Sequence, residues 1–188
     1  AAVCLFSCGT DIKNGGPDSS TPADSQTVED VAVTVKAGKN DYTIDVNGMS
    51  REFIVYATEN ALASEDVPVV FFFHGSNQTG ELAYGLTPNG SVASQISGWR
   101  EKADQEKLIV VFPTALNYCF ESTDDAGDPV SAVHEKWANG MIADGTLRLC
   151  TAEERAALSE KDQAKIDTAT VVSDEPFVEA MVDFLIQH

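Results

Sequence analysis

Residues 69–73 have the sequence Val-Val-Phe-Phe-Phe and are apolar at every position. Residues 108–112 (LIVVF) form a second run of the same kind. Unbroken apolar strands are typical of parallel sheets that helices cover on both faces. Between the two runs, residues 91–106 carry apolar side chains at helical spacing. The two strands and the helix between them predict a right-handed β–α–β crossover.

An antiparallel hairpin is expected before this crossover. Residues 42–46 (YTIDV) alternate in polarity, and residues 51–56 (REFIVY) form a second short strand. The pair Asn47-Gly48 stands between them, and Asn-Gly is the strongest short signal for a hairpin turn. The sequence therefore predicts an α/β fold with three layers, in which a mostly parallel sheet begins with an antiparallel hairpin.

A helix is predicted at residues 174–188. Asp174 and Pro176 are typical of a helix start, and Phe177, Met181, Phe184 and Leu185 fall on one helical face. A parallel sheet should receive another strand after such a helix, and we expect that strand to lie beyond His188.

The segment 114–172 is interpreted as a surface insertion that flanks the functional site. It is long and acidic, with a turn-rich stretch at 124–129 (DDAGDP) and a short helix expected near 152–158. Asp124, Asp125 and Asp128 lack the spacing of a calcium loop and are interpreted as solvated turn residues.

Composition excludes some classes of partner. The 188 residues include 30 acidic and 12 basic side chains, a net charge of −18. Binding to nucleic acid depends on Lys and Arg releasing counterions from phosphates, so a nucleic-acid partner is not expected. Anionic lipid is disfavoured for the same reason. No apolar run approaches the roughly 20 residues of a membrane-spanning helix, so we expect contact with a membrane only through a lipid anchor.

The first residues suggest such an anchor. Residues 1–8 (AAVCLFSC) look like the remnant of a secretory signal, and 5–8 (LFSC) resemble the lipobox of bacterial lipoproteins. Cys8 is then the lipidated residue, residues 9–32 are a flexible acidic tether, and 33–188 are the folded domain of an exported protein at the cell envelope or outside it. The alternative is a first strand that contains two ordinary apolar cysteines.

Cys119 and Cys150 are candidates for a disulfide because disulfides persist outside the cytoplasm. Two unpaired buried thiols are the alternative. The sequence contains no C-x-x-C pair and no Cys/His cluster at metal-binding spacing, so no metal site is predicted.

Six segments, in this order, resemble secreted esterases related to poly(3-hydroxybutyrate) depolymerases and to feruloyl and acetylxylan esterases. The resemblance covers roughly residues 40–188. The segments are 45–56 (DVNGMSREFIVY), 73–76 (FHGS), 98–104 (GWREKAD), 109–113 (IVVFP), 137–140 (WANG) and 174–184 (DEPFVEAMVDF).

This resemblance implies the N-terminal half of an α/β-hydrolase fold and a serine esterase that needs no cofactor. In that family the nucleophile sits in a G-x-S-x-G elbow on the strand after the helix at 174–188, and no such elbow occurs in this sequence. The nucleophile, the acid and the catalytic histidine are thus expected beyond His188. The resemblance assigns the oxyanion-hole loop to His74, Gly75 and Ser76: Ser76 N–H donates, Gly75 lets the backbone approach and His74 braces the loop.

The family's strand order also implies that residues 69–73 pair with the nucleophile strand. Residues 31–188 alone would then expose an apolar sheet edge, and we expect them to be insoluble or molten.

Other residues are weaker candidates for the site. Trp137 either lines the substrate pocket or packs the insertion. His134 is interpreted as a solvated loop residue, although it could line the pocket, and His188 has no expected role.

The sequence thus predicts a carboxylic ester hydrolase that acts on a polyester or a plant cell-wall ester, inactive in this fragment. The alternative is a non-catalytic surface lipoprotein that binds carbohydrate or polymer on the same scaffold.

Overall fold

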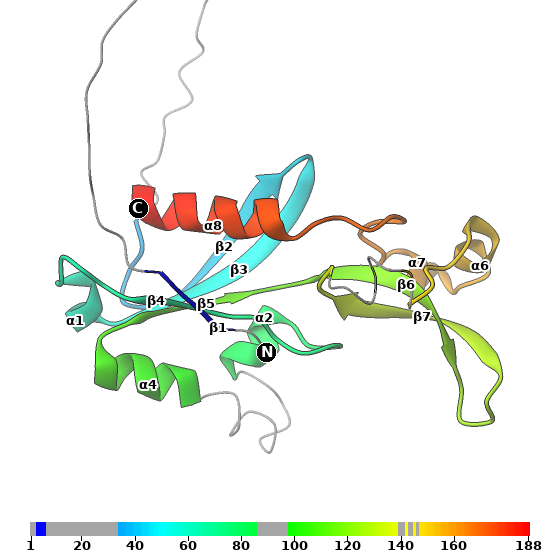
Figure 1. Cartoon of the computed structure of the whole chain (residues 1–188), viewed down its shortest axis with the longest axis horizontal. Coiled ribbons are helices and arrows are strands. Elements are labelled where there is room, and N and C mark those ends of the chain that lie inside the picture. Colours follow the sequence, from blue (N-terminus) through cyan, green and yellow to red (C-terminus); the bar gives the residue numbers. More distant parts are fainter. Residues whose placement is uncertain (1–2, 7–33, 86–97, 139–141, 143–144, 146) are drawn as a thin grey trace, which may run out of the picture.

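The computed structural model describes residues 3–6, 34–85, 98–138, 142, 145 and 147–188. Within these residues the main element is a mixed five-stranded sheet of order β1-β4-β5-β3-β2, and β6 and β7 form a separate two-stranded sheet (Figure 1). The expected α/β class is therefore present. The main-sheet strands are β1 (Val3–Phe6), β2 (Gly38–Val46), β3 (Met49–Ala57), β4 (Val69–Phe72) and β5 (Ile109–Pro113).

The predicted hairpin is confirmed, and so is the parallel pairing of the two apolar strands around a helix. β2 and β3 pair antiparallel across the Asn47-Gly48 turn, where both residues have positive φ (56° and 80°). This is the backbone conformation that an Asn-Gly hairpin turn requires. β4 and β5 pair in parallel, and β3 lies antiparallel to β5. β5 is thus in the sheet interior, as its apolar sequence predicts.

Helices cover both faces of the main sheet, as Figure 1 shows. On one face α2 (Gly80–Tyr84) and α4 (Gly98–Glu106) pack against Ile54, Val110 and Phe112. On the other face α8 (Glu175–Gln187) buries Phe177 and Met181 against the alternate strand residues. Phe184 and Leu185 pack against the same core, so the predicted apolar face of this helix is confirmed.

Before α4, the sequence analysis did not predict two helical turns, α1 (Glu59–Leu62) and α2. The expected start of the crossover helix, residues 91–97, lies outside the described residues.

In the described part of the chain, no helix is long and apolar enough to cross a membrane.

The segment 114–172 contains an unexpected hairpin. β6 (Leu116–Thr123) and β7 (Pro129–Lys136) pair antiparallel and extend away from the main sheet (Figure 1). Asp124 accepts the N–H groups of Ala126 and Asp128, so the acidic stretch is a hairpin turn. The short helix predicted near 152–158 is present as α6 (Ala152–Ala156), followed by α7 (Glu160–Gln163).

β1 occupies the free edge of β4. The two strands pair antiparallel over four residues, from Val3 with Phe72 to Phe6 with Val69. The resemblance had led us to expect an open edge here in residues 31–188, because the strand that pairs with residues 69–73 in that family is expected beyond His188. Val3–Phe6 form a strand, as in the alternative to the signal remnant. Cys8 and the tether at 9–32 lie outside the described residues.

Candidate functional site

The predicted oxyanion-hole loop follows β4 directly, and His74 anchors it in the interior. The His74 side chain is 2% exposed. Its Nε2 accepts the N–H of Ala115 at 3.1 Å, so the proton is on Nδ1, which lies 2.8 Å from the carbonyl oxygen of Gly75. Burial lowers the pKa of His74 below 6.5 and keeps the ring neutral. Both ring nitrogens are engaged, so this imidazole braces the loop and is not a free base.

Trp137 packs against the same loop. Its indole Nε1–H donates to the carbonyl oxygen of His74 at 2.9 Å. The ring lies 4.9 Å from the His74 ring and 5.0 Å from the Phe73 ring, measured between centroids. The structure thus brings two predicted residues together, with Trp137 in contact with the loop.

The exposed residue Ser76 offers the loop's free backbone donor. The Gly75 N–H donates to Oε1 of Gln78, and the Asn77 N–H donates to the carbonyl oxygen of Glu135. Within the part of the chain that the structure describes, the Ser76 N–H meets no acceptor. Its side-chain Oγ accepts from Nζ of Lys136 at 2.9 Å. The loop can therefore donate one backbone hydrogen bond to an external anion or oxyanion.

Three consecutive residues around the end of β7 hold this loop. Glu135 accepts from Asn77, Lys136 binds Ser76 and Trp137 binds His74. Sequence reasoning did not find Glu135 or Lys136. The available signal was weak, because residues 129–136 (PVSAVHEK) mix polar and apolar side chains without regular alternation.

A close backbone approach fixes the other end of the loop. The Gly80 N–H donates to Oγ1 of Thr114 at 3.0 Å. A Cβ at position 80 would clash with the carbonyl oxygen of Phe112 and lie 2.9 Å from Oγ1 of Thr114. Glycine is therefore required where α2 begins against the end of β5.

A buried ion pair lies beside the site and was also missed. Arg51 and Asp174 are 1% and 14% exposed, and Nη2 of Arg51 lies 2.8 Å from Oδ1 of Asp174. The other oxygen of Asp174 accepts the N–H of Ala138 at 2.6 Å. Asp174 was predicted to begin α8, and it stands at that N-cap, but its side chain makes no cap hydrogen bond.

A polar cleft of about 410 Å³ opens at the same end of the sheet. Thr79, Thr114, Asn117, Glu135 and Asp167 are among the residues that line it. Oδ2 of Asp167 accepts both the backbone and side-chain N–H groups of Asn117. Burial and the charge of Asp167 raise the pKa of Glu135. The hydroxyl, amide and carboxylate groups that line the cleft suit a ligand rich in hydroxyl groups.

The remaining predicted residues lie elsewhere or in other environments. His134 is half-buried on β7 opposite Tyr118, so it is not a solvated loop residue. Burial and nearby Lys136 lower its pKa. His188 packs against Phe184 at the end of α8. In the described residues, no three His, Cys, Asp or Glu side chains are arranged to hold a metal ion.

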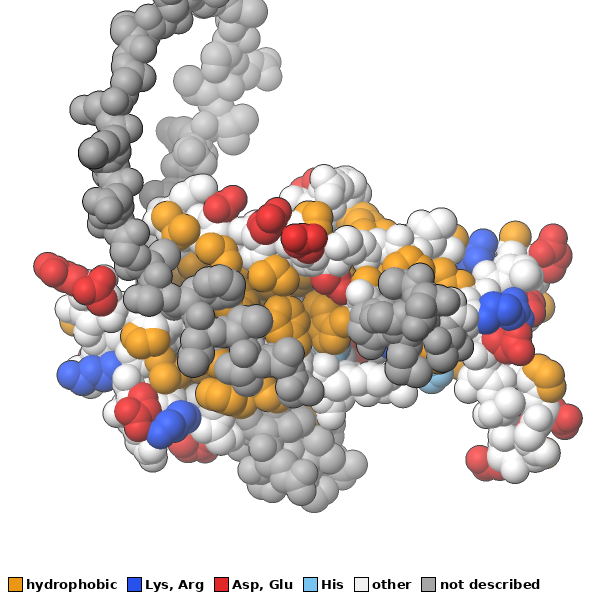
Figure 2. All heavy atoms as spheres, viewed as in Figure 1, with side chains coloured by type: hydrophobic (Ala, Val, Ile, Leu, Met, Phe, Trp, Pro, Cys, Tyr) orange, Lys and Arg blue, Asp and Glu red, His pale blue; other side chains and the backbone are white. Residues whose placement is uncertain are grey.

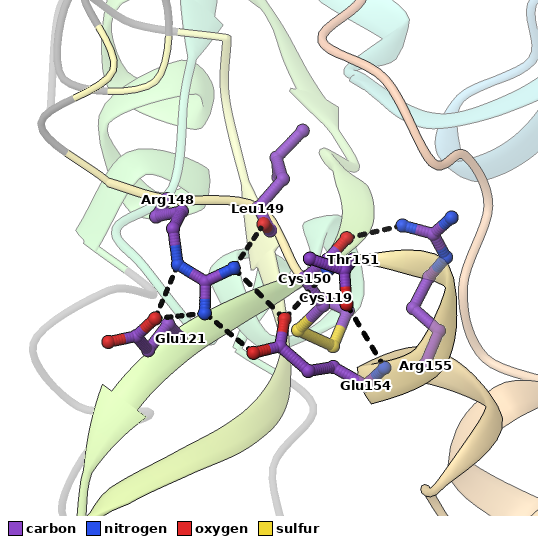
Figure 3. Close-up of a disulfide and its surroundings, with 8 residues drawn as sticks. All are labelled: Cys119, Glu121, Arg148, Leu149, Cys150, Thr151, Glu154 and Arg155. Carbon is purple, nitrogen blue, oxygen red and sulfur yellow. Dashed lines mark hydrogen bonds and ion pairs between the residues drawn. A yellow bond between two sulfur atoms is a disulfide. The ribbon is translucent and has the colours of Figure 1, made fainter.

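Cys119 and Cys150 form a disulfide with a Cα–Cα distance of 5.3 Å. It links β6 to the segment before α6 (Figure 3). Arg148 lies beside it between Glu121 and Glu154, and Glu154 also accepts the N–H of Thr151. The bond and these contacts hold the middle of β6, which pairs with β7, to the segment before α6.

No known protein family, curated protein or solved structure matches the chain.

Proposed function

We propose that this chain is part of a carboxylic ester hydrolase of the α/β-hydrolase fold that acts through a serine acyl-enzyme. The observation that carries the proposal is the N–H of Ser76 in the loop after β4, which meets no acceptor among the described residues. In ester hydrolysis negative charge develops on the former carbonyl oxygen, and fixed backbone N–H groups stabilise it. His74 and Trp137 fix the loop from the interior, so this donor is held in place before a substrate arrives.

The position of the loop in the fold supports the same proposal. In α/β-hydrolases one oxyanion donor comes from the loop after the third strand. If β2 and β3 of the hairpin are counted as the first and second strands, β4 is the third. In the sheet, β5 lies between β4 and the hairpin. A nucleophile strand would pair with β4 at the edge that β1 occupies here. The nucleophile elbow is proposed to come from sequence that follows His188.

The proposed substrates are polyesters or plant cell-wall esters, and the reaction needs no cofactor. The protein is proposed to be exported and anchored through Cys8. The disulfide supports an oxidising compartment. Radiolabelled palmitate should be incorporated into the native protein and not into a Cys8→Ala variant. Equal labelling of both proteins would contradict the anchor.

The polar cleft favours a second candidate function, non-catalytic binding of carbohydrate at the cell surface. Its carboxylates, Asn117 and threonine hydroxyls can exchange hydrogen bonds with sugar hydroxyl groups. This function predicts retention on a polysaccharide column without ester turnover.

The test uses the gene that encodes this chain and its complete product. The sequence after His188 should contain G-x-S-x-G, and the complete protein should hydrolyse p-nitrophenyl acetate and lose activity with a serine-directed phosphonate. The 188-residue chain should be inactive. A gene without the elbow, or a complete protein without phosphonate-sensitive turnover, would overturn the esterase proposal.

Ser76 allows a matched pair of variants in the complete protein. Ser76→Pro removes the N–H and should lower kcat about 100-fold or more, with a much smaller change in KM. Ser76→Ala keeps the N–H and removes only Oγ, so it should remain within a few-fold of the native rate. Equal rates for the two variants would exclude this N–H as the donor.

A further inference from the structure

We propose that the buried Arg51–Asp174 ion pair positions the loop at His74–Ser76, acting through Trp137. This inference rests on the proposed function of the loop, and it assigns Arg51 and Asp174 as positioning residues. Both residues lie in segments of the resemblance, at 45–56 and 174–184, but neither was assigned to the predicted site.

Asp174 connects two parts of the molecule that are distant in sequence. Its Oδ1 binds Arg51 on β3, and its Oδ2 accepts the N–H of Ala138 after β7. An aspartate at a helix start usually accepts a hydrogen bond from its own helix, and this one makes none. Both carboxylate oxygens therefore serve contacts outside α8.

The contact to Ala138 fixes the residue beside it. Trp137 precedes Ala138 and donates its indole N–H to the carbonyl oxygen of His74. The carboxylate of Asp174 thus holds the backbone directly after Trp137, and the indole side chain of Trp137 is hydrogen-bonded to the His74 loop.

Arg51 holds Asp174 in this position. Its guanidinium lies over the ring of Phe177 at 4.0 Å and reaches the carbonyl oxygen of Thr114 at 3.5 Å. Nε of Arg51 is buried and, among the described residues, has no hydrogen-bond partner. Burying a charged pair with an unpartnered donor is a poor way to stabilise a core, because apolar side chains of similar volume often do as well or better. A contribution to stability therefore does not explain why the chain has this ion pair, whereas a role in positioning the loop does.

The two roles separate in the double variant Arg51→Met/Asp174→Leu, tested in the 188-residue chain. If the pair positions the loop, the urea midpoint should stay at or above the native value while Trp137 loses its fixed place. The readout is the indole N–H signal in nitrogen-15 NMR spectra. The chain has two tryptophans, and Trp99→Phe assigns the two signals.

In the double variant the Trp137 indole hydrogen should exchange with solvent about tenfold faster, which corresponds to the loss of roughly one hydrogen bond. The nitrogen-15 shifts of His74 should move away from those of a ring protonated only on Nδ1. Native exchange and native His74 shifts in a folded double variant would overturn the proposal, because the pair would then be only structural.

Asp174→Asn provides a second variant if the double variant does not fold. Its amide keeps one acceptor oxygen, so it can satisfy Arg51 or Ala138 but not both. It should also speed indole exchange, and unchanged exchange would equally overturn the proposal.

The matched control is Glu154→Gln. Glu154 also binds an arginine and a backbone N–H, Arg148 and Thr151, but on the exposed surface beside β6. It should leave the signals of Trp137 and His74 unchanged, and loss of both signals in this control as well would overturn the specific role of Asp174. None of these readouts involves ester turnover, so an inactive complete protein would refute the proposed function and leave this result standing.

Discussion

His74 illustrates how a single buried side chain determines a loop. Its neutral ring accepts from Ala115 on one side and contacts Gly75 on the other, and its own carbonyl holds Trp137. The sequence predicted this bracing role from the resemblance of residues 73–76 alone. The contacts with Glu135, Lys136 and Asp174 were not predictable, because they depend on how a hairpin and a helix start distant in sequence approach the loop.

The lowered pKa of His74 predicts a pH-dependent stability. The ring is neutral in the folded chain, whereas the unfolded chain takes up a proton at this residue below about pH 6.5. The free energy of unfolding should therefore fall as the pH drops through 6.5. His74→Phe should lack this component and lose about 1 to 3 kcal/mol at pH 8, because the Ala115 N–H loses its acceptor.

Urea unfolding between pH 5 and pH 8 measures both effects. His134→Phe is the control, because the His134 side chain is less buried and has no hydrogen-bond partner among the described residues. Identical pH slopes for the native chain and His74→Phe would contradict the prediction.

Gly80 should tolerate no side chain. In Gly80→Ala the new Cβ would meet the carbonyl oxygen of Phe112, and backbone cannot move aside cheaply. We expect a loss of about 2 kcal/mol or more in the free energy of unfolding. Gly98→Ala is the matched control at the start of α4, because its Cβ would meet no atom of the described residues within 4 Å. Equal stabilities of the two variants would show that the approach at Gly80 is not tight.

At the scale of elements, the β6–β7 hairpin was the largest omission of the sequence analysis. Its strands have mixed polarity, since one face packs on Ile142 and the other is partly exposed. Strands of mixed polarity give a weak periodic signal. The continuous apolar strands β4 and β5 and the Asn-Gly turn were predictable because each depends on local sequence.

The disulfide should stabilise this element. It closes a loop with a sequence separation of 31 residues, which corresponds to about 3 to 4 kcal/mol in the chain-entropy estimate. Reduction with dithiothreitol should lower the Tm of the native chain. The double variant Cys119→Ser/Cys150→Ser should have the lower Tm already and not respond to dithiothreitol. A native chain whose Tm does not respond to complete reduction would contradict this estimate.

At the scale of the whole molecule, β1 covers the edge of β4 in this chain. Acidic side chains lie along α8 and around the hairpin end, and apolar side chains are visible between them (Figure 2).

Deleting residues 1–33 would remove β1 and leave the apolar edge of β4 unpaired. We expect the 34–188 chain to aggregate, because free strand edges pair with other chains.

Light scattering after size exclusion compares this deletion with the full chain at equal concentration. A deletion of residues 9–28, which shortens the tether and keeps β1, is the control and should behave as the full chain does. A monomeric 34–188 chain with a sharp cooperative melt would show that β1 is dispensable.

The place of β1 also has a kinetic consequence. β2 and β3 are joined by a two-residue turn and can pair early in folding. β1 pairs with a strand that is distant in the sequence, since Val3 lies opposite Phe72. Loop-closure entropy delays such distant pairings. We expect β1 to dock last in folding and detach first in native-state fluctuations. Hydrogen-exchange mass spectrometry should then show rapid deuteration of β1 and the slowest of β5, so that the molecule opens from the β1 edge inward.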